Sequence, residues 1–173
     1  MMILSTGLIA QQSRTEVTNA PRANEDSRLN SDSVPNAYAI SGQFQRILIL
    51  RFKYQTDLLA GLRTMVQQEK IRNAVILSGI GSVRNYRVHT VSNRTFPSKN
   101  VFVTDSTGSA DIAGMNGYII EGRVHAHITL ADSSHAFGGH LESGTNVFTF
   151  AIVTVGVLPD SVDLKRVDDT TYR

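Results

Sequence analysis

Apolar and polar residues recur along the chain with two different periods, and each period predicts a different kind of element. In residues 57–70 the apolar side chains stand one, three or four positions apart, at Leu58, Leu59, Leu62, Met65 and Val66. This spacing is typical of one face of an amphipathic helix. Thr56 or Asp57 supplies the N-cap, because either side chain can accept a hydrogen bond from the first turn.

Short apolar or alternating runs bounded by turn residues predict about seven strands. They cover residues 46–53, 74–78, 85–91, 101–104, 118–121, 124–131 and 147–157. Their connections are too short to contain crossover helices, so the strands should pair mainly antiparallel. We therefore expect an α+β fold, a largely antiparallel β-sheet of about seven strands with one main α-helix packed on it. Gly79-Ile80-Gly81 should form a turn between two strands, because no helix follows it as a phosphate-binding loop requires.

The part before residue 44 differs in composition from the rest. Residues 1–12 contain an uncharged apolar run that fits a truncated signal segment without its basic start. If they are such a remnant, the protein is exported or periplasmic; otherwise it is cytoplasmic, with a frayed or locally docked N-terminus. Residues 13–43 are polar and contain two prolines, which predicts a disordered linker. Residues 44–173 should form a single soluble domain, since no apolar stretch is long enough to span a membrane.

Composition narrows the chemistry that the chain can perform. It has 173 residues, 41% of them apolar, and no cysteine, so thiolate ligands, thiol catalysis and disulfides are excluded. Histidine and carboxylate remain as metal ligands. The formal net charge is only +2, and lysine and arginine are scattered. A dedicated nucleic-acid binder normally shows a concentrated basic patch, so DNA is a partner that the sequence allows but does not favour.

Three histidines in the last third of the chain predict a metal site. In a strand, His125 and His127 project to the same face, two positions apart. A turn-forming segment and the pair Gly138-Gly139 then return the chain towards them and bring His140 alongside. Three neutral imidazoles at one point bind a divalent transition metal, most often zinc. The alternative is that His125 and His127 are partly exposed strand residues hydrogen-bonded to neighbours.

Other polar residues are secondary candidates for the same site. Glu142 could orient a ligand imidazole or act as an acid or base beside the metal, or be an ordinary exposed carboxylate. His89, on another predicted strand, could complete the site or be structural. Arg84 and Arg87 could bind an anionic ligand across a subunit boundary, or be surface arginines. His135 lies in the polar turn and should be solvated.

Three segments of the chain together resemble the domain conserved in plants and prokaryotes, PPC, in its stand-alone prokaryotic form. They are residues 74–83, 122–132 (Gly-Arg-Val-His-Ala-His-Ile-Thr-Leu-Ala-Asp) and 138–141 (Gly-Gly-His-Leu). The resemblance covers about residues 44–159. It implies one helix against a largely antiparallel sheet, a homotrimer, and the DNA-binding label that prokaryotic members commonly receive. The chain has no Arg-Gly-Arg-Pro element, the AT-hook through which the plant proteins contact DNA.

The PPC fold is also similar to that of acetolactate decarboxylase, a zinc enzyme with a His-x-His pair and a later histidine as ligands. In this chain those positions would be His125, His127 and His140. Two classes of function follow. The first is a metal-dependent protein that binds or transforms a small oxygen-containing ligand, as an enzyme or a sensor. The second is a non-enzymatic DNA-binding or protein-interaction domain.

Overall fold

The computed structural model describes residues 12–18, 33, 35–94 and 98–167. Within these residues there are one helix, α1 (Leu58–Gln68), and eight strands. The strands are β1 (Ser13–Thr18), β2 (Arg46–Lys53), β3 (Ala74–Val91), β4 (Lys99–Asp105), β5 (Ala110–Ile120), β6 (Arg123–Ala131), β7 (Ala136–Leu141) and β8 (Asn146–Val157). All of their pairings are antiparallel, so the predicted α+β architecture is confirmed. The helix in the described part of the chain is not long and apolar enough to cross a membrane.

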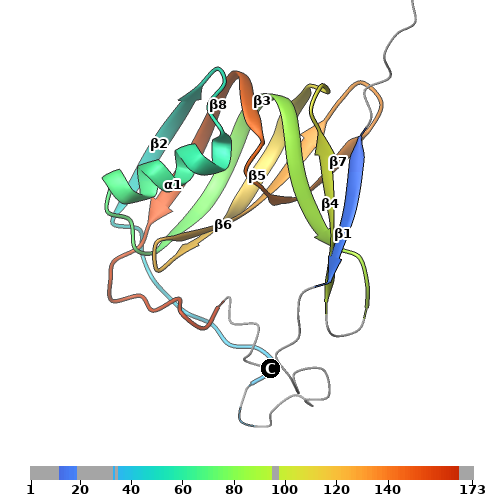
Figure 1. Ribbon diagram of the computed structural model, residues 1–173. Helices are drawn as coiled ribbons and strands as arrows, with labels where there is room; N and C mark the ends of the chain where they lie inside the picture. Colours follow the sequence, from blue (N-terminus) through green and yellow to red (C-terminus); the bar gives the residue numbers. More distant parts are fainter. Residues whose placement is uncertain (1–11, 19–32, 34, 95–97, 168–173) are drawn as a thin grey trace, which may run out of the picture.

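The sheet is organised around β3, which is long enough to pair with different strands at its two ends. Its first half lies between β5 and β8, and β2 pairs with the far side of β8. Its second half pairs with β4 and β7, and β1 covers the outer side of β4. Because β5, β6 and β7 follow one another, the path from β3 through them returns to β3. Figure 1 shows this curved sheet, with β1 and β4 at one end and α1 at the other.

The prediction of a turn at residues 79–81 is wrong, because β3 runs through these residues without a break. Gly81 has φ of +136°, and a Cβ there would lie 2.1 Å from the carbonyl oxygen of Phe150. Glycine at this position therefore allows close approach of β8 to β3 within a continuous strand.

Two further segments differ from the sequence-based expectations. Residues 13–18, assigned to the disordered linker, form β1 on the edge of β4. Thr15 and Val17 have β-branched side chains suited to a strand, but only the free edge of β4 offers their backbone partners. Residues 136–139, expected to belong to the connection before His140, form β7 together with His140 and Leu141. The leader prediction for residues 1–12 lies almost wholly outside the described residues.

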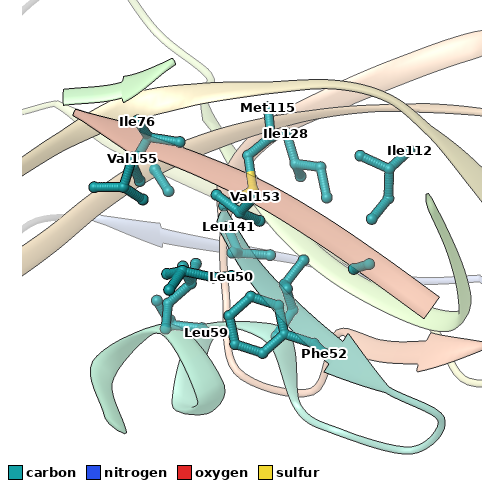
Figure 2. Close-up of a cluster of buried hydrophobic side chains, with 14 of the residues drawn as sticks. Leu50, Phe52, Leu59, Ile76, Ile112, Met115, Ile128, Leu141, Val153 and Val155 are labelled. Atoms are coloured by element: carbon teal, nitrogen blue, oxygen red, sulfur yellow. The ribbon is translucent and has the colours of Figure 1, made fainter. Parts of the chain in front are cut away.

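Alternation along the strands places the main hydrophobic core between α1 and the sheet and inside its curve. Leu50 and Phe52 of β2 project towards α1, which buries Leu58, Leu59, Leu62 and Val66. Figure 2 shows Leu50, Phe52 and Leu59 together with Ile76, Met115, Ile128, Leu141 and Val153 from the surrounding strands. The histidines of β3, β6 and β7 lie on the opposite face of these strands.

Asp57 is the N-cap of α1, one of the two residues proposed from sequence. Its Oδ1 accepts a hydrogen bond from the Ala60 amide at 2.9 Å, and its Oδ2 accepts one from the Gly144 amide at 2.7 Å. The same carboxylate thus anchors the helix to the turn between β7 and β8.

We expect Asp57→Ala to lower the free energy of unfolding by about 1–2 kcal/mol, because both amides lose their acceptor. Urea denaturation measures the effect. Asp57→Asn should retain most of the stability, and Asp111→Ala, at an exposed position on β5, should leave it unchanged. Equal stability of Asp57→Ala and the wild-type protein would contradict the assignment of this cap.

Candidate metal centre

Backbone pairing aligns histidines on one outer face of the sheet. His89 of β3 is the register partner of His140 of β7, and His140 is the partner of His127 of β6. Paired residues in antiparallel strands project to the same face. His125 stands two positions from His127 on that face, with the buried Ala126 between them. Four imidazoles from three neighbouring strands therefore gather in one patch.

The three histidines predicted from sequence lie close to one another. Ring centroids are 5.4 Å apart for His125 and His127, 4.9 Å for His125 and His140, and 5.5 Å for His127 and His140. The Nε2 atoms of His125 and His127 are 3.3 Å apart. Two nitrogens bound to one tetrahedral zinc at about 2.0–2.1 Å are separated by about 3.3–3.4 Å. The donor chemistry and this spacing both fit a divalent metal ion.

His89 and Glu142 join the patch from the side of β3. The rings of His89 and His140 are stacked with centroids 4.5 Å apart. Donor atoms of His89, His140 and Glu142 all lie within 4.8 Å of one another, close enough to share an ion. The fourth histidine and the carboxylate were only secondary candidates from sequence, because nothing in their spacing along the chain indicates that β3 pairs with β7.

Hydrogen bonds assign the tautomers of two rings. Nδ1 of His89 lies 2.7 Å from Oε1 of Glu142, and a carboxylate can only accept, so this nitrogen carries the proton. Nδ1 of His140 lies 3.1 Å from the carbonyl oxygen of Leu141 and 3.4 Å from the same Glu142 oxygen. In the neutral form of either ring, Nε2 is then the unprotonated nitrogen. An imidazole held in this way by a carboxylate or carbonyl is a well-oriented metal ligand.

The electrostatics of the patch favour the neutral form of two of its imidazoles, those of His127 and His140. Partial burial lowers the pKa of His127 below its usual value of 6.5, and the neighbouring His125 and His89 lower it further. Burial also lowers the pKa of His140, with contributions from His89 and His125, while Glu142 acts in the opposite direction. Neutral rings are the form that binds a metal.

These lowered pKa values make acid conditions unfavourable for the metal-free protein. Between the folded-state pKa and 6.5, the unfolded chain binds more protons at His127 and His140 than the folded chain does. We expect the free energy of unfolding to decrease as pH falls through this window, and NMR titration to give both rings a pKa below 6.5. A His127→Ala variant should show a weaker pH dependence. Rings that titrate above 6.5 would contradict this account.

Two adjacent glycines let β7 lie between its neighbours. A Cβ on Gly138 would lie 2.1 Å from the carbonyl oxygen of Ile128 in β6, and a Cβ on Gly139 would lie 2.4 Å from that of His89 in β3. Asp132 shapes the preceding turn, where it accepts hydrogen bonds from Ser134 and His135 that lower its pKa to about 2. The sequence-based prediction that this segment brings His140 beside His127 is confirmed by their pairing.

The remaining candidates lie around the patch or away from it. His135 is largely exposed in the β6–β7 turn, as predicted, with Nδ1 3.1 Å from Asp132. Arg84 donates a hydrogen bond to the hydroxyl of Tyr54 at 2.6 Å. Arg87 stands two positions from His89 on β3, and its guanidinium lies 5.1 Å from the ring centre of Phe102. Phe102 also packs against His89, so Arg87 alone of the two arginines borders the patch.

The comparisons with known proteins agree with this architecture. Residues 39–159 match the Plants and Prokaryotes Conserved (PCC) domain, the family named PPC in the sequence analysis. The chain belongs to this family. It matches no curated protein.

Solved structures with the same fold come from several prokaryotes. A plant- and prokaryote-conserved protein of Pyrococcus horikoshii is 22% identical, with a TM-score of 0.62 over 79% of this chain and 94% of that one. A metal-containing protein of Archaeoglobus fulgidus is 23% identical, with a TM-score of 0.61 over 70% and 86% of the two chains. A candidate DNA-binding protein of Ralstonia eutropha is 24% identical, with a TM-score of 0.52 over 64% and 77%. The similarity to acetolactate decarboxylase stays a prediction.

Proposed function

We propose that this PCC-domain protein binds one divalent transition metal ion, preferentially zinc, through His125, His127 and His140. The observation that supports it most directly is the 3.3 Å spacing of two Nε2 atoms beside a third ring whose Nδ1 proton is directed to Leu141 and Glu142. The Archaeoglobus protein of the same fold is described as metal-containing, which is consistent with this proposal.

The ligand of such a centre is a small molecule with a carbonyl or carboxylate oxygen. Three imidazoles leave the fourth coordination position of a tetrahedral metal open. A metal with such an open position polarises a ligand oxygen bound there, or lowers the pKa of a bound water to about 7. Arg87 borders the patch and is suited to an anionic group. Glu142 holds His89 and His140 in their tautomers and is placed to exchange a proton near the ligand.

Metal content and ligand binding test this function together. Protein purified without a polyhistidine tag and without added metal should contain about one zinc per chain. Cobalt substitution should give a visible spectrum typical of a tetrahedral site with an open position, and a small carboxylate such as acetate should change it. Metal-free protein that fails to bind added zinc, with its fold intact, would contradict the proposal.

We also propose a homotrimer, supported by an apolar face with no cover in the described chain. Register pairing places Ile49 of β2, Ile152 of β8 and Ile80 of β3 on the face of the sheet opposite the core. Ile49 is 73% exposed and Ile80 54%, and the nearby Phe148 is 45% exposed. Soluble monomers rarely leave such a patch open. Light scattering should give three chains per particle, and a monomer mass would refute the trimer.

The alternative function is DNA binding, favoured by the Ralstonia relative described as a candidate DNA-binding protein. This function predicts an affinity for duplex DNA that falls steeply with salt, because bound phosphates release counterions. Titration of a fluorescent duplex at two salt concentrations distinguishes the two functions. Salt-sensitive binding that survives removal of the metal would favour the alternative.

A further inference from the structure

We infer that a second site, separate from the histidine patch, binds a small carboxylate with an apolar or aromatic body in a cavity beneath β1. The cavity has a volume of about 220 Å³ and is lined by parts of β1, β3, β4 and β7. Its residues include Arg14 and Gln12 from the segment before the matched PCC domain. This inference does not depend on the proposed metal function.

One wall of the cavity is mainly apolar. Val88 of β3 pairs with Val103 of β4, and Thr90 pairs with Val101, so these four side chains project to the same face. Val88 and Thr90 alternate with His89, whose ring belongs to the histidine patch on the other face, although His89 also borders the cavity. Phe137 of β7 completes the wall, packed against Tyr86 with ring centroids 4.8 Å apart. A flat aliphatic or aromatic group fits such a space.

The polar groups that line the cavity can all donate hydrogen bonds, and no carboxylate is among them. Arg14 is the register partner of Val103, so its side chain lies on the cavity face of β1. Among the described residues the guanidinium of Arg14 has no ion-pair or hydrogen-bond partner, although its backbone lies in the β1–β4 ladder. Glu16, the nearest acidic residue on β1, accepts a hydrogen bond from Ser92 at 2.6 Å and does not line the cavity. A guanidinium that lines a partly apolar cavity is matched by a carboxylate.

The cavity depends on β1 being docked. Gln12 donates a hydrogen bond to the hydroxyl of Tyr86 at 3.3 Å, which connects the start of β1 to the aromatic wall. All six residues of β1 pair with β4. The segment ahead of the domain therefore supplies both the cover of the cavity and its only arginine.

Saturation-transfer NMR with benzoate tests the site on the full chain, with benzyl alcohol as the neutral control. We expect millimolar binding of benzoate to the chelator-treated, metal-free protein, where no metal can hold a carboxylate, and much weaker binding of benzyl alcohol. Arg14→Gln should weaken benzoate binding at least about tenfold, since a charge-assisted pair is lost. Arg51→Gln, at an exposed arginine on β2, is the matched control and should leave the affinity unchanged.

A second variant tests the cavity itself. Val103→Phe places a larger side chain in the cavity and should abolish benzoate binding while the circular dichroism spectrum stays native. The inference is overturned if benzoate does not bind, if Arg14→Gln binds it as well as wild type, or if benzyl alcohol binds equally well. Benzoate binding that disappears when the metal is removed would assign benzoate to the histidine patch and would also overturn the inference. Benzoate binding that persists in protein without metal supports the inference.

Discussion

Replacing His140 by alanine should remove most of the bound metal, from about one ion per chain to less than about a tenth of that after dialysis. His140 is the ring that the other imidazoles share, paired with His127 on one side and with His89 on the other. Even loss of an outer partner of a ligand costs about 10–100-fold in metal affinity, so loss of a ligand should cost more. Elemental analysis and zinc titration measure the effect.

His135→Ala is the matched control, because His135 lies in the β6–β7 turn outside the patch and is largely exposed. It should retain the metal in full. Thermal unfolding of both variants without metal shows whether the fold is intact, since the side chain of His140 is only partly buried. A His140→Ala protein that keeps one ion per chain would refute the three-histidine site.

Glu142→Gln refines the same prediction. The amide can still accept a hydrogen bond from His89 or His140, but it no longer carries the negative charge that supports their protonated Nδ1 atoms. We expect zinc affinity to fall about 10–100-fold with the metal still bound at high concentration. A complete loss of metal would instead identify Glu142 as a direct ligand, which its distance to His89 and His140 also allows.

Gly139→Ala should disrupt the metal centre although every imidazole remains. Its added Cβ would lie 2.4 Å from the carbonyl oxygen of His89 and 2.8 Å from the side chain of Thr90. Backbone cannot yield as a flexible side chain does, so β7 must move away from β3 and take His140 with it. We expect a loss of about 1–3 kcal/mol in the free energy of unfolding and a marked fall in zinc affinity. Urea denaturation and zinc titration measure the two effects.

Gly114→Ala provides the control for this substitution. Gly114 also lies in a strand of the sheet, but a Cβ there would meet nothing within 4 Å. Its stability and zinc affinity should remain close to wild type. If Gly139→Ala behaves like Gly114→Ala, close packing of β7 against β3 does not position His140.

Local periodicity was enough to predict the elements whose pattern reflects a single buried face. Such patterns predict the helix, with Asp57 as one of its two N-cap candidates, and the strands β2 and β6. The structure confirms these elements and the cap. Glycine misled the interpretation at Gly81, which was assigned to a turn but lies inside a strand where another backbone approaches closely. Gly138 and Gly139 bring His140 beside His127 as expected, although they do so from inside strand β7 and not from a connection.

The amino-acid sequence by itself determined the α+β class, the shared face of His125 and His127, and the return of His140 towards them. These features depend on the period of a strand and on turn residues close together in the chain. Only the tertiary structure decided that His89 and Glu142 join the patch. It also decided that residues 12–18 complete a cavity whose other lining residues lie much later in the sequence. Both depend on pairing between distant strands, β3 with β7 and β1 with β4, which backbone hydrogen bonds and core packing select and local sequence does not encode.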